Sequence, residues 1–462
     1  MIKKVLNGKF IVLGLLILQL ISMVLSIKTG NDLVLYTQFL ILVIVMGFIL
    51  LLINDKLFIQ VFVIVSILSS YFYLDSSFGY IYYAAHVLLV IMAIRLLLKY
   101  KSLKVDKYIV GIACALFIFS ILPLFNLEYE FKVAAILYAL FIKFGYLLVY
   151  LYVINSKGFT MKSLHSFNVG LAIFFVVNVI YTILQFLFSN VNGDNMTGFF
   201  GYQGTGIAGY FYCFFFSIVC AYNYKDRVSN SVVFLVAVTI IFISALNETK
   251  VLFIYIPIMI IMYFIFIKKS ISSLIVIGLF FGSLLIIYPI YASLYPTQAL
   301  FLDGDFIEKY MVNSAYDGEN SINRFNFVES LNFYILDNGI KQLFGAGLGM
   351  TYPSSNAIIA GEVFIKYGFL RYNFFLFPWL YADSGLVGIL LFVITYLIIF
   401  IYAIRNFKKT KSFIALSVVL MSFVNLLFSL YNQVLLSSFF IYAIFWMYAA
   451  MLFKERRNKE SR

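Results

Sequence analysis

Charged residues are scarce in this chain of 462 residues, because Asp, Glu, Lys and Arg together make up only 11% of it. Soluble domains are roughly a quarter charged and about half apolar, whereas hydrophobic residues reach 64% here. A soluble fold could not bury so much apolar surface, but a lipid bilayer accepts it. The composition therefore excludes a soluble globular protein and predicts an all-α polytopic membrane protein.

Cysteine and histidine are rarer still, with three and two residues. Cys114, Cys213 and Cys220 all lie inside apolar runs, so they do not indicate a disulfide framework. No cluster of His, Cys and carboxylate residues has the spacing of metal ligands. We therefore expect neither a bound metal nor a cofactor.

Long apolar runs are abundant, and a run of about 20 residues suffices to cross a bilayer. They predict about fourteen spans, near residues 10–27, 33–53, 57–74, 79–98, 108–125, 132–154, 167–188, 206–223, 231–247, 250–267, 273–295, 384–404, 414–431 and 435–453. A membrane part (1–295), one long loop (296–383) and a second membrane part with a basic tail (384–462) follow from this pattern. Asn247 to Lys250 is interpreted as a tight turn between two spans.

The basic residues predict the orientation, because cytoplasmic loops retain Lys and Arg. With the N-terminus in the cytoplasm, most of the 33 basic residues fall in cytoplasmic loops and at the two termini, and the short outer loops hold only Lys28, Lys132 and Lys250. An even number of spans also places the C-terminus inside. The net charge of +13 is then mainly a topology signal, and nucleic acid is not an expected partner.

The long loop is rich in apolar residues and is predicted to be structured and external. Ser321 to Phe344 is interpreted as one amphipathic helix, which packs on the protein or lies on the membrane. Its apolar stripe consists of Ile322, Phe325, Val328, Leu331 and Ile335. Val363 to Leu380 also carries charge and Pro378, and therefore favours a re-entrant or interfacial segment over a clean span.

Several charges in apolar surroundings require a partner or a function. Arg371 offers a planar fork suited to phosphate or carboxylate, but an ion pair with Glu362 or Asp383 is an equally simple role. Lys309 and Lys341 are interpreted as solvated loop charges.

Two further basic residues lie within predicted spans. Lys143 is near the middle of its span, where we expect a polar cavity, a structural partner or snorkelling. Arg95 is close to the cytoplasmic end, where its side chain is expected to snorkel to the interface.

The order of motifs around the long loop resembles a known family. Arg324 is followed by the predicted helix, a glycine turn and an acid-x-Gly-x-x-Gly element; the turn is Gly345-Ala346-Gly347-Leu348-Gly349 and the element is Asp383-Ser384-Gly385-Leu386-Val387-Gly388. This order resembles the O-antigen polymerase and O-antigen ligase superfamily of bacterial envelope glycosyltransferases. The Gly- and aromatic-rich stretch 197–206 and Lys250, where many members carry Arg, fit the same resemblance.

The resemblance implies a GT-C-like enzyme of the bacterial cytoplasmic membrane with its active site outside. Donor and acceptor would be polyprenyl-diphosphate-linked oligosaccharides, and the reaction would invert without a metal; a chain-length regulator is a further expected partner. The expected substrate-binding residues are Arg324, Arg371, Lys250, Gly345, Gly347 and Gly349, and the candidates for the catalytic base are Asp383, Glu248 and Glu362.

One departure from the family separates its branches. The ligase branch typically carries a His in the long loop ahead of the acid-x-Gly-x-x-Gly element, whereas this chain has only His86 and His165. The missing His favours a polymerase that joins lipid-linked repeat units. An O-antigen ligase or protein O-oligosaccharyltransferase is the first alternative, and a lipid-linked oligosaccharide flippase is the second.

Overall fold

The computed structural model describes residues 53–71, 83–100, 102–126, 132–188, 193–201, 204–296, 322–354 and 356–460, together with 51, 130 and 299. Within these residues every regular element is a helix. Six of them are long and apolar enough to cross a membrane, and three more are shorter and apolar. The described part of the chain is therefore all-helical, and its long apolar helices are those of a multi-pass membrane protein. The predicted spans 10–27 and 33–53 lie almost wholly outside the described residues.

Each of the other predicted spans overlaps a helix in the described residues. These helices are α3 (Asp55–Tyr71), α4 (Ala84–Lys99), α5 (Lys107–Ile121), α6 (Val133–Asn155), α7 (Met161–Phe188), α8 (Thr205–Tyr224), α9 (Asn230–Leu246), α10 (Leu252–Ile261), α11 (Ile271–Leu294), α16 (Leu376–Thr410), α17 (Phe413–Phe428) and α19 (Phe439–Glu460). The turn predicted at Asn247 to Lys250 separates α9 from α10. A π-helical segment, η5 (Met262–Lys268), continues α10.

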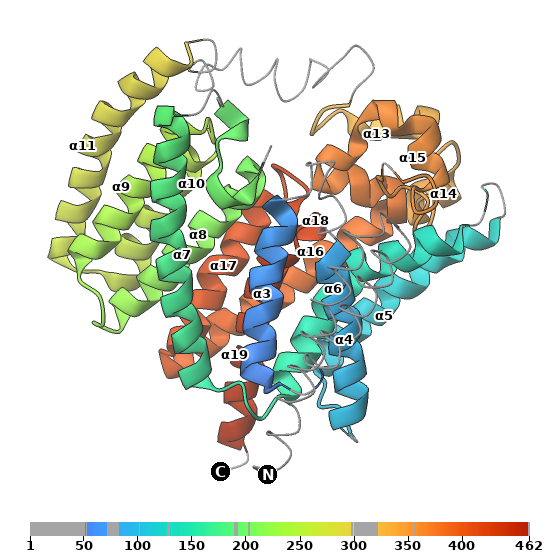
Figure 1. Cartoon of the computed structure of the whole chain (residues 1–462), viewed down its shortest axis with the longest axis horizontal. Helices are drawn as coiled ribbons and strands as arrows, with labels where there is room; N and C mark the ends of the chain where they lie inside the picture. Colours follow the sequence, from blue (N-terminus) through green and yellow to red (C-terminus); the bar gives the residue numbers. More distant parts are fainter. Residues whose placement is uncertain are drawn as a thin grey trace, which may run out of the picture.

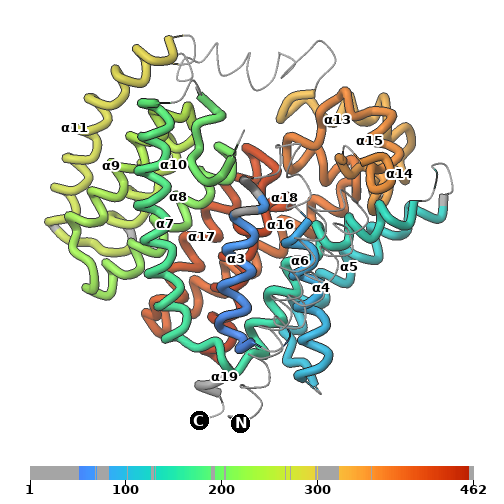
Figure 2. Tube along the Cα trace, in the orientation of Figure 1, coloured from blue at the N-terminus to red at the C-terminus, as the bar shows by residue number. Residues whose placement is uncertain are grey.

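The helices form one bundle in which α19 is central (Figures 1 and 2). It packs against α6 and α17, while α17 also packs against α8 and α16. Phe439 to Phe453 is buried along its whole length, as expected for a helix that is apolar on every side. By contrast, Ile173 on α7 and Leu285 on α11 are exposed, which suits helices that face lipid.

Short helices of the long loop form a cap over the upper ends of α5, α6 and α16 in the view of Figure 1. The lower end of the bundle in this view is the end at which α19 finishes. They are α13 (Phe327–Tyr334), α14 (Gly339–Phe344), α15 (Glu362–Tyr367), η8 (Gly368–Leu370) and η9 (Tyr372–Phe374). No continuous span occurs over 363–375, in agreement with the sequence.

The prediction of a single helix from Ser321 to Phe344 is wrong. The chain breaks between α13 and α14, where the side chain of Asn338 accepts a hydrogen bond from the backbone N–H of Lys341 (3.0 Å) and so caps a new helix. Leu331 is buried, as are Ile322 and Ile335, but Phe325 and Val328 are exposed. The apolar stripe therefore does not lie on one helical face.

Two predicted spans contain or adjoin an interruption. The predicted start of a span at Ser384 lies beside the kink of α16 at Gly385 (φ 62°, ψ −162°), and a further helical stretch precedes this kink from Leu376. The predicted span 435–453 is divided into α18 (Val434–Ser437) and α19 by an extended Ser438. Local hydropathy does not detect such interruptions.

Asp55 organises the lower end of the bundle. It accepts hydrogen bonds from Arg95 Nη2 (2.8 Å), Lys99 Nζ (2.6 Å), Tyr152 OH (2.6 Å), Ser156 Oγ (3.0 Å) and Tyr100 OH (3.1 Å). Burial raises the pKa of Asp55, but these hydrogen bonds and the charge of Lys99 outweigh it and hold the pKa well below its ordinary value. The expectation that Arg95 snorkels is wrong, since its side chain is buried and meets acceptors inside the protein.

Candidate functional site

The glycine turn fits into the interruption of α16. The backbone N–H groups of Ala346 and Gly347 donate to the carbonyl oxygens of Ala382 (2.8 Å) and Asp383 (3.0 Å). Gly345, at φ 79°, lies so close to α16 that an added Cβ would come within 2.4 Å of the Asp383 carbonyl carbon. The two motifs of the resemblance are therefore joined backbone to backbone, and glycine is required for the close approach.

Gly349 holds the same turn against another helix. Its φ is 85°, and an added Cβ would lie 2.8 Å from the Ile136 backbone on α6. Leu348 N–H donates to the Ser120 carbonyl at the end of α5 (2.8 Å). The turn thus connects three helices, and its glycines shape the backbone at this end of the bundle.

A buried ion pair lies beneath the turn. Lys143 Nζ is 2.5 Å from Asp383 Oδ2, and both side chains are at most 3% exposed. Lys143 also donates to the hydroxyls of Ser120 and Ser384, and Thr351 Oγ1 donates to Asp383 Oδ1 (3.2 Å). Of the three roles considered for Lys143, the structure supports that of an ion with a structural partner, Asp383. This pairing offsets the free-energy cost of placing an ammonium group inside a span.

Arg324 lies between two aromatic rings at the upper end of the bundle. Its guanidinium carbon is 4.6 Å from the Phe375 ring centre and 5.2 Å from that of Tyr431. Its Nε donates a long hydrogen bond to the Tyr431 carbonyl (3.4 Å), and the side chain is buried. The long loop thus holds this cation against the turn that connects α17 to α18.

Arg371 comes from the segment that pairs with the Arg324 segment, because Ile322 N–H donates to the Leu370 carbonyl (2.9 Å). Arg371 has a left-handed backbone (φ 55°) between η8 and η9, and its guanidinium carbon is 5.6 Å from the Phe374 ring centre. The structure pairs the acids suggested for it with other residues: Glu362 is 3.5 Å from Lys132 and Asp383 is bound to Lys143.

Lys341 is not the solvated charge that the sequence indicated. It is buried, and its Nζ lies 2.9 Å from Asp337, four residues earlier in the break before α14. Lys309 lies outside the described residues.

Glu248 and Lys250 pair with each other in the α9–α10 turn, with Nζ 3.3 Å from Oε1. Asp194, which the sequence did not single out, faces them from a short loop helix. It keeps contact with solvent, but desolvation by its neighbours and the charge of Glu248 raise its pKa to about 6, against the opposing effects of Lys250 and Thr205. The position of Asp194 beside the Glu248–Lys250 ion pair cannot be recognised from the sequence, because it depends on the tertiary structure.

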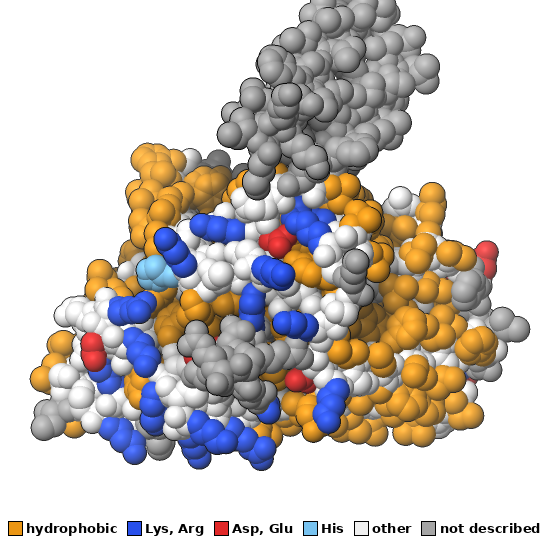
Figure 3. All heavy atoms as spheres, turned by 90° about the horizontal axis from the view of Figure 1, so that it is seen from below, with side chains coloured by type: hydrophobic (Ala, Val, Ile, Leu, Met, Phe, Trp, Pro, Cys, Tyr) orange, Lys and Arg blue, Asp and Glu red, His pale blue; other side chains and the backbone are white. Residues whose placement is uncertain are grey.

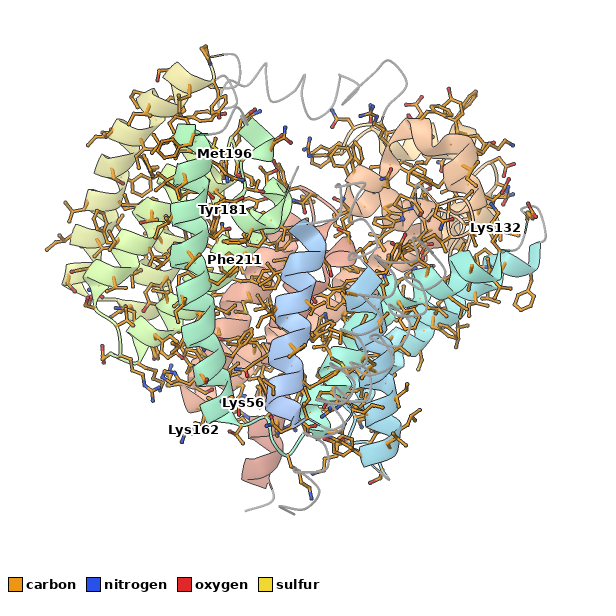
Figure 4. The ribbon with its side chains drawn as sticks, viewed as in Figure 1. Lys56, Lys132, Lys162, Tyr181, Met196 and Phe211 are labelled. Atoms are coloured by element: carbon orange, nitrogen blue, oxygen red, sulfur yellow. The ribbon has the colours of Figure 1, made fainter. Side chains whose placement is uncertain are left out.

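The segment 193–201 folds into the bundle. Met196 is buried and lies above Tyr181 and Phe211 (Figure 4). Phe199 N–H donates to Asn178 Oδ1 (2.8 Å) and Gly198 N–H to Gln185 Oε1 (2.8 Å). These bonds anchor the segment to α7.

The predicted site residues thus form three groups: Asp383 with the glycine turn, Arg324 beside the Arg371 segment, and Glu248 with Lys250. Glu362 stands apart, on α15 beside Lys132. Among the described residues, no group of three or more His, Cys, Asp or Glu has the arrangement of a metal site. No protein-family model matches the chain, and no curated protein shows significant similarity to it.

Proposed function

We propose that this protein is a bacterial envelope polysaccharide polymerase of about fourteen spans with a GT-C-like architecture. In the proposed reaction, the bond between the anomeric carbon of a glycan and its polyprenyl diphosphate breaks, and a bond to a hydroxyl of a second lipid-linked repeat unit forms. The hydroxyl proton passes to a carboxylate, and polyprenyl diphosphate departs. Catalysis therefore needs cations for the diphosphate and a base for the hydroxyl.

The observation that carries this proposal is the placement of Arg324. A guanidinium held between Phe375 and Tyr431 has a fixed orientation, as bidentate recognition of a diphosphate requires. The pairing of Ile322 with Leu370 brings the Arg371 segment to the same part of the loop.

The distribution of basic residues supports an external site. Lys and Arg side chains gather on the lower face of the molecule, with few acids among them (Figure 3). Lys56 and Lys162 lie at that end, whereas Lys132 lies toward the other (Figure 4). Under the positive-inside rule the lower end is cytoplasmic, and the Arg324 loop then faces outward.

Among the carboxylates, Glu248 of the α9–α10 turn and the neighbouring Asp194 are the best candidates for the base. The Glu248 side chain is 17% exposed, whereas that of Asp383 is 3% exposed and ion-paired. Beside Glu248, the raised pKa of Asp194 approaches the range suited to a general base near neutral pH. We therefore assign proton transfer to the pair Asp194 and Glu248 and a supporting role to Asp383.

The test is the length distribution of lipid-linked glycans in a strain that lacks this protein. A polymerase predicts single repeat units on the outer face and no long polymer. Long polymer that stays on its lipid carrier would support the ligase alternative instead. Repeat units retained on the cytoplasmic face would support the flippase alternative.

A further inference from the structure

Asn425 lies in α17, close to the end that leads to α18, and is only 1% exposed. Neither of its amide atoms, Oδ1 or Nδ2, has a hydrogen-bond partner among the described residues. The two asparagines of α7, Asn168 and Asn178, are by contrast hydrogen-bonded through both amide atoms. Since buried polar atoms are nearly always satisfied in folded proteins, the Asn425 amide indicates a polar group that binds there.

Ser422 lies one helical turn before Asn425 on the same side of α17 and is fully buried. Its hydroxyl also has no partner among the described residues. Five other buried serines donate to the backbone carbonyl four residues earlier in their helices: Ser66, Ser120, Ser217, Ser244 and Ser417. The Ser422 hydroxyl does not make this bond, so it is free to serve a group outside its own helix.

Tyr210 belongs to the contact between α8 and α17. Its ring centre is 4.3 Å from that of Phe428, which lies one turn after Asn425. The Tyr210 hydroxyl is buried and has no partner among the described residues, whereas the hydroxyl of Tyr212 on the same helix accepts a hydrogen bond from Asn178 Nδ2 (2.9 Å). Two packed helices thus carry unsatisfied donors and acceptors near one contact.

Water fits these groups better than an ion or a large ligand. The three side chains are uncharged, so they would not neutralise an ion, and each is at most 1% exposed, so they do not admit a large molecule. An amide and two hydroxyls offer donors and acceptors together, and a buried water that makes about three hydrogen bonds can satisfy both kinds. We propose that ordered water binds between Asn425, Ser422 and Tyr210 and bridges α8 and α17 inside the bundle.

The two bridged helices lead to different groups of the candidate site. The first turn of α8 contacts Asp194 through Thr205, and α17 leads to the turn whose Tyr431 carbonyl accepts the hydrogen bond from Arg324. The water therefore fixes the helix beside the carboxylates relative to the helix beside the arginine. Its binding does not depend on the proposed function.

Radiolytic footprinting of the full chain in detergent tests the water site, because an X-ray pulse converts bound water into hydroxyl radicals that oxidise adjacent side chains. Tyr210 and Tyr212 are matched reporters, since both lie on α8, both are fully buried, and only Tyr212 has a partner for its hydroxyl. We expect Tyr210 to be oxidised roughly tenfold faster than Tyr212. Equally slow oxidation of the two tyrosines in the wild type would overturn the proposal.

Two variants remove the groups on α17. Asn425→Leu replaces the amide by an apolar side chain of similar size, and Ser422→Ala removes the hydroxyl. Each should lower the oxidation rate of Tyr210 by roughly threefold or more and leave that of Tyr212 unchanged. The matched control is Ser417→Ala, which removes a hydroxyl that already has a backbone partner on the same helix and should change neither rate.

An unchanged Tyr210 rate in both variants, or an equal loss in Ser417→Ala, would also contradict the water site. The comparison of the two tyrosines in the wild type decides the question even where a variant fails to fold.

Discussion

At the residue scale, the charges of this protein divide into those that stabilise the bundle and those that face the proposed substrate. Asp55 and Asp383 each bind a lysine or arginine from another helix inside the protein. Arg324, by contrast, lies between the rings of Phe375 and Tyr431, which hold its guanidinium in a fixed orientation. Substitutions in the first group should change the stability of the protein, and substitutions in the second should change its activity.

Arg324→Lys should reduce polymer synthesis strongly at unchanged protein abundance. Lysine keeps the charge but lacks the planar fork, and a lost interaction with a leaving group costs about 3 kcal/mol, or roughly a hundredfold in rate. We expect the same for Arg371→Lys. Glycan length in cells with matched expression is the measurement, and Lys366→Ala, at an exposed position of the loop, should leave it unchanged.

Normal polymer from both Arg→Lys variants would remove these arginines from the mechanism. Lys250, the third basic residue that the family resemblance suggests, would then be the one whose role is still to be tested.

Asp55→Asn should destabilise the protein by about 3–5 kcal/mol, because it leaves the buried Arg95 without its counter-charge. The lowered pKa of Asp55 also has a consequence for pH. Its contribution is complete above the ordinary aspartate pKa of 3.8 and is lost as the pH falls below that value. Thermal unfolding in detergent across this range should therefore show an acid-dependent loss in the wild type that is smaller in the variant.

Asp226→Asn is the control for this experiment. Asp226 is largely exposed and lies 3.7 Å from Lys268, so its loss should change stability by no more than about 1 kcal/mol. An equal effect of the two substitutions would contradict the distinction between buried and surface pairs.

At the element scale, the protein depends on the fit between the glycine turn and the interrupted helix α16. Added Cβ atoms at Gly345 and Gly385 would come within 2.4 Å and 2.3 Å of backbone carbons across this contact, and both residues have positive φ. Backbone atoms cannot move aside as a flexible side chain can, so the contact requires glycine on both sides.

Gly345→Ala and Gly385→Ala should therefore each destabilise the loop by more than about 2 kcal/mol, from left-handed strain together with the clash. Limited proteolysis of residues 322–375 in membranes should become faster. Gly278→Ala on α11, where an added Cβ meets nothing within 4 Å, should be neutral or stabilising. Unchanged proteolysis of both loop variants would show that the contact is not needed to hold the loop.

At the scale of the whole molecule, the two ends of the bundle differ in charge and in structure. The lower end carries the basic loops, and the upper end carries the short helices of the long loop (Figures 1 and 3). Such an asymmetry predicts a fixed orientation in the membrane.

Cysteine labelling checks this orientation. In a Cys114→Ala background, where Cys213 and Cys220 are buried, a membrane-impermeant maleimide should label Asn356→Cys in intact cells or spheroplasts. Lys409→Cys should react only after lysis. The reverse pattern would place the Arg324 loop in the cytoplasm and would remove the basis for an external active site.

The sequence by itself determined the helical, membrane-embedded class and the position of nearly every described span. A span depends on the local length and apolarity of the chain, and both can be counted along it. The glycine turn and Asp383 could likewise be recognised in the sequence as motifs of one loop. The start of α16 at Leu376 could not, because the apolar residues before Asp383 form a helical turn that packs on the protein.

Only the tertiary structure decided which charges meet. Arg95 and Asp55 are 40 residues apart, and Lys143 and Asp383 are 240 apart, so no local pattern could pair them. The same holds for Asp194 beside Glu248. Hydrophobic burial is nearly additive along the chain, whereas an ion pair or a hydrogen bond depends on the placement of two specific atoms, which is fixed only when the helices pack.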